Sequence, residues 1–519
     1  MQKEATLGAV LHQRAESQAL SCALIHNERR TSYEELNRHA SQIANGLAAL
    51  GVNRGQRVAF LGKNSDLYFE LLLGAARAGV TTVPLNWRLA TPEIAAILAD
   101  AHISMLFLGL GFAGMLPALA LREDLPRVAM DGADPALPDF AAWREAQPDT
   151  SPPSRADAED TLLLMYTSGT TGLPKGVELT HRNVLYLLAS GREGGALAFG
   201  PDDRVIICMP VAHVSGTNVG LGAIIYGSTT VVMAEFDPAR LVDLIPRHRA
   251  TWVLLVPAAL RLVVQHPAAA SGDFRSLQTM AYGASPIAEA LIEQARVTFP
   301  AASLWQLYGL TEASGGGTIL DPASHDPARN KLRSCGKPYP GFELRIVDLD
   351  GIDVPTGEVG EIVLRTPGVM KGYWRNPAAT AAAFFPGDWL RTGDAAHIDS
   401  EGYVYIYDRV KDMIVSGGEN IFPAEVENAL YGHPAIADVA VIGVPDERWG
   451  EAVKALVVLK PDADANEADV IAHARTRIAG FKVPKSVEFL NALPRNAAGK
   501  LLRRKLREPY WEGRDRRVS

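Results

Sequence analysis

Short apolar runs alternate along this chain with longer stretches in which apolar residues recur at helical spacing. One of these stretches opens with Ser32 and Glu35, which form the S-x-x-E pattern of a capping box. Apolar residues then recur at Leu36, Ala40, Ile43, Leu47 and Leu50. Gly51 stands where such a helix would stop. The pattern predicts a helix that begins after residue 32 and ends at about residue 50.

The apolar runs between such stretches predict short buried strands. They span residues 58–61, 162–165, 205–209, 230–233 and 252–256, and residues 71–78 read as part of a second helix. Residues 117–153 are rich in Ala, Pro, Asp and Arg and are predicted to be a surface excursion. The alternation of strands and helices predicts an α/β architecture.

The pattern changes toward the C-terminus. From about residue 340 the runs become shorter and β-like, at 342–347, 360–365 and 403–407. With 519 residues, the chain is too long for one ordinary core. We predict a large domain over residues 1–408 and a small α+β domain over residues 409–519, with strands at 439–444 and 452–459 and a helix at 467–478.

Composition narrows the class of protein. Apolar residues make up 47% and charged residues 21%, as in soluble globular proteins. A net charge of −8 argues against a nucleic-acid partner. The widely separated Cys22, Cys208 and Cys335 fit neither a metal site nor a disulfide framework, which favours a cytoplasmic location. No apolar run suggests a signal peptide or a transmembrane segment, although peripheral membrane contact stays compatible with the sequence.

Residues 166–177 read YTSGTTGLPKGV and have the composition of a phosphate-binding loop. Glycines let backbone N–H groups approach an anion closely, hydroxyls add donors, and Lys175 adds positive charge. The stretch is not a Walker A loop, because Gly176 rather than Ser or Thr follows the lysine. The alternative, a solvated polar loop, stays open for this stretch taken alone.

Four further clusters contain groups that could bind a nucleotide. WQLYGLTEA (305–313) offers Tyr308 for stacking on a base, Thr311 for a phosphate oxygen and Glu312 for Mg²⁺. WLRTGD (389–394) offers Asp394 for ribose hydroxyls. The other two are DRVKDMIVSGGENIFPAE (408–425), with Arg409 and a Gly417-Gly418 pair, and PRNAAGK (494–500), with Lys500. Each cluster alone is better explained as a polar turn or a surface ion pair.

Together and in this order, the five clusters resemble the adenylate-forming (ANL) superfamily of acyl-CoA synthetases, amino-acid adenylation domains and firefly luciferase. The resemblance extends from about residue 30 to residue 505 and is strongest to bacterial fatty-acyl-CoA and aryl-CoA synthetases. It implies a large N-terminal domain of several α/β subdomains and a small mobile C-terminal domain. It also implies two half-reactions: a carboxylate and ATP give an acyl-adenylate and pyrophosphate, and a thiol then displaces AMP.

The resemblance assigns roles to individual residues. Lys500 is implied as the catalytic lysine of adenylation, Thr311 as the α-phosphate contact, and Glu312 with Thr167 as Mg²⁺ ligands. Nucleotide binding is implied for Thr167, Ser168, Gly169, Thr170, Thr171, Lys175, Gly283, Ala284, Ser285, Tyr308, Asp394 and Arg409. Lys411 is implied as the hinge of the small domain, and CoA contacts are implied for Gly417, Gly418, Trp449 and Phe481.

The acyl pocket is implied to draw on His213, Val214, Ser215, Gly309, Gly315 and Gly316, and His213 is also implied as a catalytic residue. No acidic residue that would bind a substrate amine follows His213, and no cation for a second carboxylate is evident there. The glycines of residues 315–317 are expected to leave space for an acyl chain or a flat ring. The expected substrate is therefore a medium- or long-chain fatty acid or an aromatic acid.

The expected reactants are this carboxylate, ATP with Mg²⁺, and coenzyme A, and the enzyme is compatible with a homodimer. A stand-alone enzyme that loads a carrier protein or an amine is the alternative among enzymes. A nucleotide-binding regulatory protein without catalysis is the alternative from another class, against which the retention of Lys175, Glu312, Asp394 and Lys500 argues.

Overall fold

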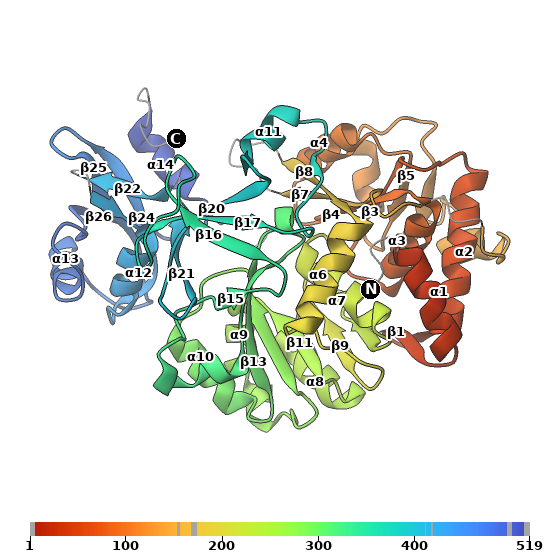
Figure 1. Cartoon of the computed structure of the whole chain (residues 1–519), viewed down its shortest axis with the longest axis horizontal. Helices are drawn as coiled ribbons and strands as arrows, with labels where there is room; N and C mark the ends of the chain where they lie inside the picture. Colours follow the sequence, from red (N-terminus) through yellow and green to blue (C-terminus); the bar gives the residue numbers. More distant parts are fainter. Residues whose placement is uncertain are drawn as a thin grey trace. The chain divides into compact units, whose positions relative to one another are not determined.

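The fold is that of a computed structural model of the whole chain. It describes residues 6–152, 156–167, 174–409, 412–416, 419–495 and 501–512, and of residues 408, 409, 419 and 420 the backbone alone. The chain divides into two compact units (Figure 1). The larger unit comprises Met1–Leu344 and Leu364–Leu390, and the smaller unit comprises Arg345–Val363 and Arg391–Ser519.

The first sheet of the larger unit has nine strands in the order β15-β14-β13-β12-β11-β9-β10-β1-β2. In that order the strands span Lys337–Pro338, Gly317–Leu320, Ser303–Gly309, Thr279–Gly283, Trp252–Leu255, Arg204–Ile207, Thr229–Val232, Cys22–His26 and Arg29–Ser32. Six strands run parallel to one another: β13, β12, β11, β9, β10 and β1. At the two edges, β2 pairs antiparallel with β1, β14 with β13, and β15 with β14. Parallel strands place their carboxyl ends on one edge, where α/β sheets bind ligands.

The second sheet of the larger unit has seven strands in the order β18-β8-β7-β4-β3-β5-β6. In that order the strands span Gly372–Tyr373, Lys175–Thr180, Thr161–Thr167, Thr81–Leu85, Arg57–Leu61, Met105–Leu108 and Arg127–Ala129. The central strands are continuous buried runs, as expected when helices cover both faces of a parallel sheet.

Helices pack against both sheets of the larger unit (Figure 1). They are α1 Leu7–Gln18, α2 Tyr33–Ala49, α3 Asp66–Ala78, α4 Thr91–Ala101, α5 Phe140–Glu145, α6 His181–Glu193, α7 Val214–Ile225, α8 Pro238–His248, α9 Pro257–Val264, α10 Glu289–Thr298 and α11 Pro377–Ala382. Short 3₁₀ helices span Ala113–Ala118 (η1), Pro267–Ser271 (η2), Thr311–Ala313 (η3), Pro322–His325 (η4) and Pro327–Arg329 (η5). The capping box that the sequence predicts at the start of α2 is present, with Ser32 and Glu35 bonding each other's backbone N–H.

One prediction about the larger unit is wrong. Residues 117–153 are not only a surface excursion, because they contain β6 and α5 and place Leu119, Val128 and Phe140 in the core. The apolar runs that contain these residues are short, and stretches rich in Pro, Asp and Arg separate them, so the pattern did not reveal their burial. Each of the three is nevertheless at most 2% exposed.

The smaller unit contains a sheet in the order β23-β22-β25-β24, with β26 beside β25. These strands span Glu419–Ile421, Ile414–Ser416, Gly450–Leu459, Ile436–Asp446 and Ser486–Phe489. Helices α12 Pro423–Tyr431, α13 Glu467–Arg475 and α14 Arg503–Trp511 accompany them. The helix predicted at 467–478 therefore ends three residues earlier than expected. The hydrophobic core of this unit includes Ile414, Val441, Val453 and Val470.

A further sheet has the order β16-β17-β20-β19, with β21 beside β20. Its strands span Glu343–Val347, Gly360–Arg365, Trp389–Ile398, Phe384–Phe385 and Val404–Arg409. The division between the two units falls inside β16, β17 and β20. The domain boundary after residue 408 stays a prediction, since compactness does not reveal where a domain would rotate.

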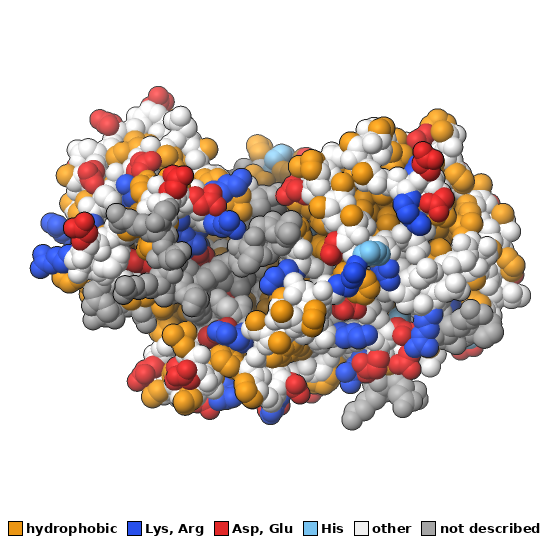
Figure 2. All heavy atoms as spheres, turned by 90° about the horizontal axis from the view of Figure 1, so that it is seen from above, with side chains coloured by type: hydrophobic (Ala, Val, Ile, Leu, Met, Phe, Trp, Pro, Cys, Tyr) orange, Lys and Arg blue, Asp and Glu red, His pale blue; other side chains and the backbone are white. Residues whose placement is uncertain are grey.

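The surface carries charges of both signs. On the face seen in Figure 2, Lys and Arg side chains are interspersed with Asp and Glu. Among the described residues, none of the helices combines the length and apolar character needed to cross a membrane.

Candidate active site

The end of the β7–β8 hairpin brings together two residues predicted to bind phosphate. Thr167 is the last residue of β7 and lies opposite Lys175, the first residue of β8. The predicted phosphate ligands Ser168, Gly169, Thr170 and Thr171 lie outside the described residues. The hairpin thus fixes both ends of the predicted loop.

Lys175 and Glu312 converge on one aromatic ring. The Lys175 ammonium lies 4.9 Å from the ring centroid of Tyr373. The Tyr373 hydroxyl donates a hydrogen bond of 2.9 Å to Oε1 of Glu312. Sequence reasoning missed Tyr373, because its position depends on the pairing of β18 with β8, in which Tyr373 lies opposite Val177.

The segment that carries Glu312 is held tightly on both sides. Thr311 and Glu312 form the 3₁₀ turn η3 directly after β13. The Met370 amide donates to the Glu312 carbonyl at 2.7 Å. Ser314, at a φ of 57°, donates through Oγ to the Gly368 carbonyl at 2.8 Å. These bonds fix the direction in which the Glu312 side chain leaves the backbone.

The residues predicted to enclose adenine lie on neighbouring parallel strands. Gly283 ends β12 and pairs with Leu307 of β13, next to Tyr308. A Cβ on Gly283 would lie 2.0 Å from the Leu307 carbonyl oxygen, so only glycine fits there. Ala284, at a φ of 64°, and Ser285 follow as exposed residues. The fold therefore brings Tyr308 and the Gly283–Ser285 segment to the same edge of the sheet.

His213 stands at the start of α7, as the residue before Val214. The residue is half-buried, and desolvation lowers its pKa below the ordinary value, with the nearby positive charge of Arg88 lowering it further. Both effects favour the neutral form of the His213 ring. Val214 and Ser215 begin the helix and are half-buried.

The glycines of the predicted acyl pocket do not leave open space, contrary to the expectation from sequence. A Cβ on Gly316 would lie 2.6 Å from the Phe342 ring, and one on Gly309 would lie 2.1 Å from the Gly315 carbonyl oxygen. A Cβ on Gly315 would lie 3.2 Å from Val214. These glycines allow the backbone and neighbouring side chains to pack closely, so any room for substrate is set by those side chains.

The residues around Glu312 fit a magnesium ion that arrives with ATP. Within the described part of the chain, no group of three or more His, Cys, Asp or Glu could hold a metal. Mg²⁺ in nucleotide enzymes is usually held by one or two carboxylates together with substrate phosphates and water. Among the described residues, Glu312 bonds through Oε1 to Tyr373, and its Oε2 has no partner. Within the described part of the chain this carboxylate oxygen is therefore available as one ligand for such an ion.

Two predicted ribose contacts lie opposite each other in the smaller unit. Asp394 in β20 pairs with Arg409 in β21, and the Asp394 residue is 7% exposed. Asp394 lies within a strand and not in a turn, the alternative that the sequence left open. Of Arg409 the structure describes the backbone only.

The predicted CoA contacts Trp449 and Phe481 are each 42% exposed. A cation accompanies each ring: Arg448 lies 4.6 Å from the Trp449 centroid and Lys482 lies 5.5 Å from that of Phe481. Exposed rings beside cations suit stacking on a base near phosphates. The predicted hinge Lys411, the glycines Gly417 and Gly418, and the catalytic Lys500 lie outside the described residues.

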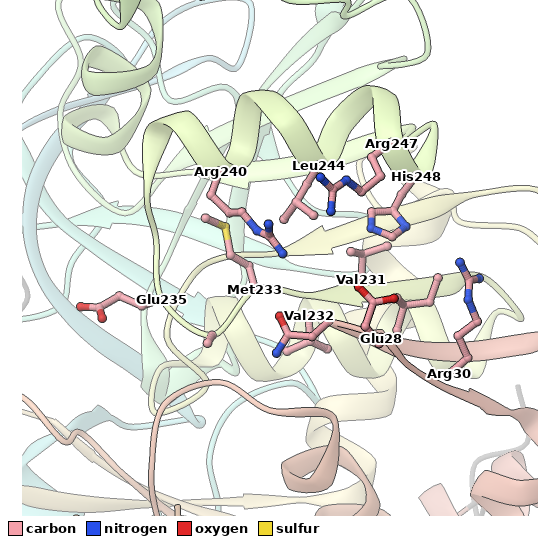
Figure 3. Close-up of a pocket in the computed structure, with 13 residues that line it drawn as sticks. Glu28, Arg30, Val231, Val232, Met233, Glu235, Arg240, Leu244, Arg247 and His248 are labelled. Carbon is pink, nitrogen blue, oxygen red and sulfur yellow. The ribbon is translucent and has the colours of Figure 1, made fainter. Parts of the chain in front are cut away.

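A cavity of about 440 Å³ in the larger unit lies apart from these residues. Figure 3 shows its wall of α8 side chains, including Arg240 and His248, facing Val231 and Glu28. None of the residues predicted for catalysis or binding lines it. It is therefore not the predicted acyl pocket.

Comparisons with known proteins agree with this arrangement. Residues 11–374 match the family model for AMP-binding enzymes, and residues 425–500 match that for the AMP-binding enzyme C-terminal domain. The chain thus belongs to the AMP-binding enzyme family within the adenylate-forming superfamily, as an ATP-dependent acyl-CoA synthetase. ATP, a carboxylate and CoA are the small-molecule substrates of this class.

Three similar proteins illustrate the family. The fatty acid–[acyl-carrier-protein] ligase ScoC of Streptomyces coeruleorubidus is 39% identical over 97% of this chain and 96% of its own length. A feruloyl-CoA synthase of Amycolatopsis sp is 39% identical over 97% of this chain and 99% of its own length. A solved fatty acyl CoA synthetase of Mycobacterium tuberculosis matches with a TM-score of 0.78 and 35% identity, over 97% of this chain and 98% of that one. The predicted fold class, with a large N-terminal and a small C-terminal domain, is confirmed.

Proposed function

We propose that this enzyme activates an apolar carboxylic acid, either a medium- or long-chain fatty acid or an aromatic acid, and transfers the acyl group to coenzyme A. The observation that carries the proposal is the convergence of Lys175 and Glu312 on Tyr373. This convergence supports a nucleotide site in which Lys175 would bind phosphate and Glu312 would bind Mg²⁺. Lys175 and Glu312 come from segments far apart in sequence. A loop that is merely solvated would not need to bring two such segments together.

In the first half-reaction, a carboxylate oxygen of the acid attacks the α-phosphorus of ATP. The bond from that phosphorus to the bridging oxygen breaks, and pyrophosphate leaves with the electron pair. Lys175 and Thr167 hold the outgoing phosphates, Thr311 contacts the α-phosphate, and Lys500 bridges carboxylate and phosphate. Glu312 and Thr167 would hold Mg²⁺, which would neutralise phosphate charge when bound.

In the second half-reaction, the thiol of CoA loses its proton to solvent and the sulfur attacks the acyl carbon. The bond from that carbon to the adenylate oxygen breaks, and AMP leaves. Rotation of the small domain about Lys411 would remove Lys500 and bring Gly417 and Gly418 beside the pantetheine, with Trp449 and Phe481 near the CoA nucleotide. We therefore expect Lys500→Ala to slow adenylation strongly and thioester formation from a supplied acyl-adenylate little. Equal losses in both steps would contradict this alternation.

The apolar substrate class is supported by the chemistry of the predicted pocket. The lowered pKa of His213 favours its neutral form, and the other predicted lining residues, Val214, Ser215, Gly309, Gly315 and Gly316, have no charge. These residues offer no partner for the second charge of a dicarboxylic acid, and Arg88 near His213 already pairs with Glu235. The names of the relatives, which include a feruloyl-CoA synthase and a fatty acid ligase, extend to aromatic and to aliphatic acids.

A carrier protein is the second candidate for the acceptor. The observation in its favour is the 39% identity to a fatty acid–[acyl-carrier-protein] ligase over almost the whole chain. Both acceptors present a phosphopantetheine thiol, so the adenylation half-reaction would be the same. A cytoplasmic location and a homodimer remain predictions from the sequence.

The deciding experiment measures AMP formation with ATP and Mg²⁺ across a panel of acids from acetate to palmitate, with benzoate, cinnamates and amino acids. Each acid is tested with CoA, with a phosphopantetheinylated carrier protein, and with neither. We expect CoA-dependent AMP formation that is greatest for fatty or aromatic acids. Turnover that requires the carrier protein would establish the second candidate. ATP binding without pyrophosphate release from any acid would overturn the proposal.

A further inference from the structure

Tyr373 contacts two groups predicted to serve ATP, each on a different segment of the larger unit. Its hydroxyl donates to Oε1 of Glu312 at 2.9 Å, and its ring lies 4.9 Å from the Lys175 ammonium. We propose that Tyr373 is a positioning residue that holds the Glu312 carboxylate and the Lys175 ammonium ready for metal-bound ATP. This inference rests on the proposed function, because it concerns the groups that would bind Mg²⁺ and phosphate.

The phenol has the chemistry that such a role requires. A hydroxyl that donates to one carboxylate oxygen fixes the rotation of the carboxylate and leaves its negative charge in place. A lysine or arginine partner would instead neutralise that charge. Within the described residues the second oxygen, Oε2, has no hydrogen-bond partner, so it is available to a cation. Hydrogen bonds of this kind orient metal ligands, and their loss commonly weakens metal binding by about 10- to 100-fold.

The ring serves Lys175 in the same way. The face of a tyrosine attracts a cation through its negative quadrupole, but it leaves the ammonium charge in place. A carboxylate partner would compete with phosphate for that charge. None of the described carboxylates forms an ion pair with Lys175, so the ammonium keeps its charge for an anionic ligand. One side chain thus aligns both a cation and an anion and neutralises neither.

The backbone of Tyr373 is fixed by its neighbours, which makes it a firm support. Its amide donates to Thr380 Oγ1 at 2.9 Å. The next amide, that of Trp374, donates to the Gly176 carbonyl at 2.7 Å, and the indole of Trp374 donates to the Asp100 carbonyl at 3.0 Å. Lys175 and Tyr373 therefore lie on adjacent paired strands of one sheet, and the phenol hydrogen bond connects Glu312 to them.

Two substitutions separate the two contacts. Tyr373→Phe removes the hydroxyl and keeps the ring, whereas Tyr373→Leu removes both. The first readout is equilibrium binding of Mn²⁺, as a probe for Mg²⁺, in the presence of a non-hydrolysable ATP analogue, followed by electron paramagnetic resonance. The second readout is affinity for the analogue without metal.

We expect Tyr373→Phe to weaken Mn²⁺ binding by about 10-fold or more and to leave metal-free binding of the analogue unchanged. Tyr373→Leu should weaken both, because Lys175 also loses its support. The matched control is Tyr431→Phe, which removes a tyrosine–carboxylate hydrogen bond of 2.6 Å to Asp438 in the smaller unit. The control should bind Mn²⁺ and nucleotide as the unmodified enzyme does.

Unchanged Mn²⁺ affinity in Tyr373→Phe would overturn the inference, and because this variant keeps the ring, the result does not depend on whether Tyr373→Leu folds. Failure of the proposed function has a different signature. In that case the unmodified enzyme would release no pyrophosphate from any acid, while the effect of Tyr373→Phe on Mn²⁺ binding could still be measured. The two ideas can therefore fail separately.

Discussion

Two glutamates of the larger unit stand near an aromatic ring and a lysine, yet their surroundings differ. Glu235 pairs with two cations: Lys63 lies 2.6 Å from Oε2 and Arg88 lies 3.2 Å from Oε1. Both cations also lie over the ring of Trp87, at 5.2 and 4.1 Å from its centroid. The charge of Glu235 is thus balanced within the protein itself.

Glu312 is arranged in the opposite way. Its described hydrogen-bond partner is the neutral phenol of Tyr373, and the nearby Lys175 rests on the ring of that residue. The aromatic residue thus stands between the acid and the base at this site, whereas at Glu235 the acid and both bases meet directly. The difference accords with the proposal that a ligand balances the charges of Glu312 and Lys175. Glu235, by contrast, belongs to a partly exposed ion-pair network of small energetic weight.

The largest expected effect comes from neutralising each acid in turn. Glu312→Gln keeps the acceptor for Tyr373 but removes the negative charge, and we expect pyrophosphate release to fall by about 100-fold or more, because phosphate charge is no longer neutralised through the metal. Glu235→Gln is the matched control and should stay within about 3-fold of the unmodified rate. Equal losses in the two variants, measured as initial rates at saturating Mg²⁺, would remove the distinction between the two sites.

The two lysines offer the next test. Lys175→Met retains most of the side-chain length and loses the charge, so we expect the KM for ATP to rise by about 10-fold, the cost of one charge-assisted contact to phosphate. Lys63→Met should leave that KM unchanged, because Lys63 already pairs with Glu235. Steady-state kinetics with varied ATP checks both. A rise in KM for Lys63→Met of the same size would show that the Glu235 network also reaches the nucleotide.

A feature could be predicted from the sequence where neighbouring residues alone determine it, and not where distant segments must meet. The sequence could single out Thr167, Lys175 and Glu312 as candidates, because small residues and a charged group recur within a short stretch, and their roles stay predictions. Tyr373 was not predictable in this way. It acts on Glu312, 61 residues away, through the pairing of β18 with β8, and the fold alone brings them together.

Two errors have the same physical origin. Phe140 is fully buried although the segment before it is rich in Asp and Pro, because the tertiary fold decides its burial. The glycine run after Glu312 suggested empty volume, whereas Phe342, distant in sequence, packs against Gly316. A sequence shows which side chains are absent at a position, but only the fold shows what fills the space.

A smaller effect should be visible in the titration of His213, because Arg88, the ion-pair partner of Glu235, lies near this histidine. The positive charge of Arg88 adds to burial in lowering the pKa of His213. Arg88→Gln removes that charge, so the pKa should rise, and the ring should take up its proton at a higher pH. Glu235→Gln should do the reverse, because it leaves Arg88 without its partner. NMR titration of the His213 ring measures both, and shifts of the same sign in the two variants would contradict this account.

The smallest expected effect is on the free energy of unfolding. It distinguishes a loss of activity caused by the missing charge from one caused by impaired folding. Glu235 and Lys63 are 39% and 43% exposed, and exposed ion pairs contribute about 0–1 kcal/mol, so Glu235→Gln should lower the free energy of unfolding by less than about 1 kcal/mol. Glu312→Gln should cost no more, since the amide oxygen still accepts from Tyr373. Ser32→Ala, which removes the capping box of α2, should cost about 1 kcal/mol and calibrates the measurement by urea unfolding. If Glu312→Gln destabilised the larger unit more than Ser32→Ala, its loss of activity would reflect folding, and Glu312 would be a structural acid like Glu235.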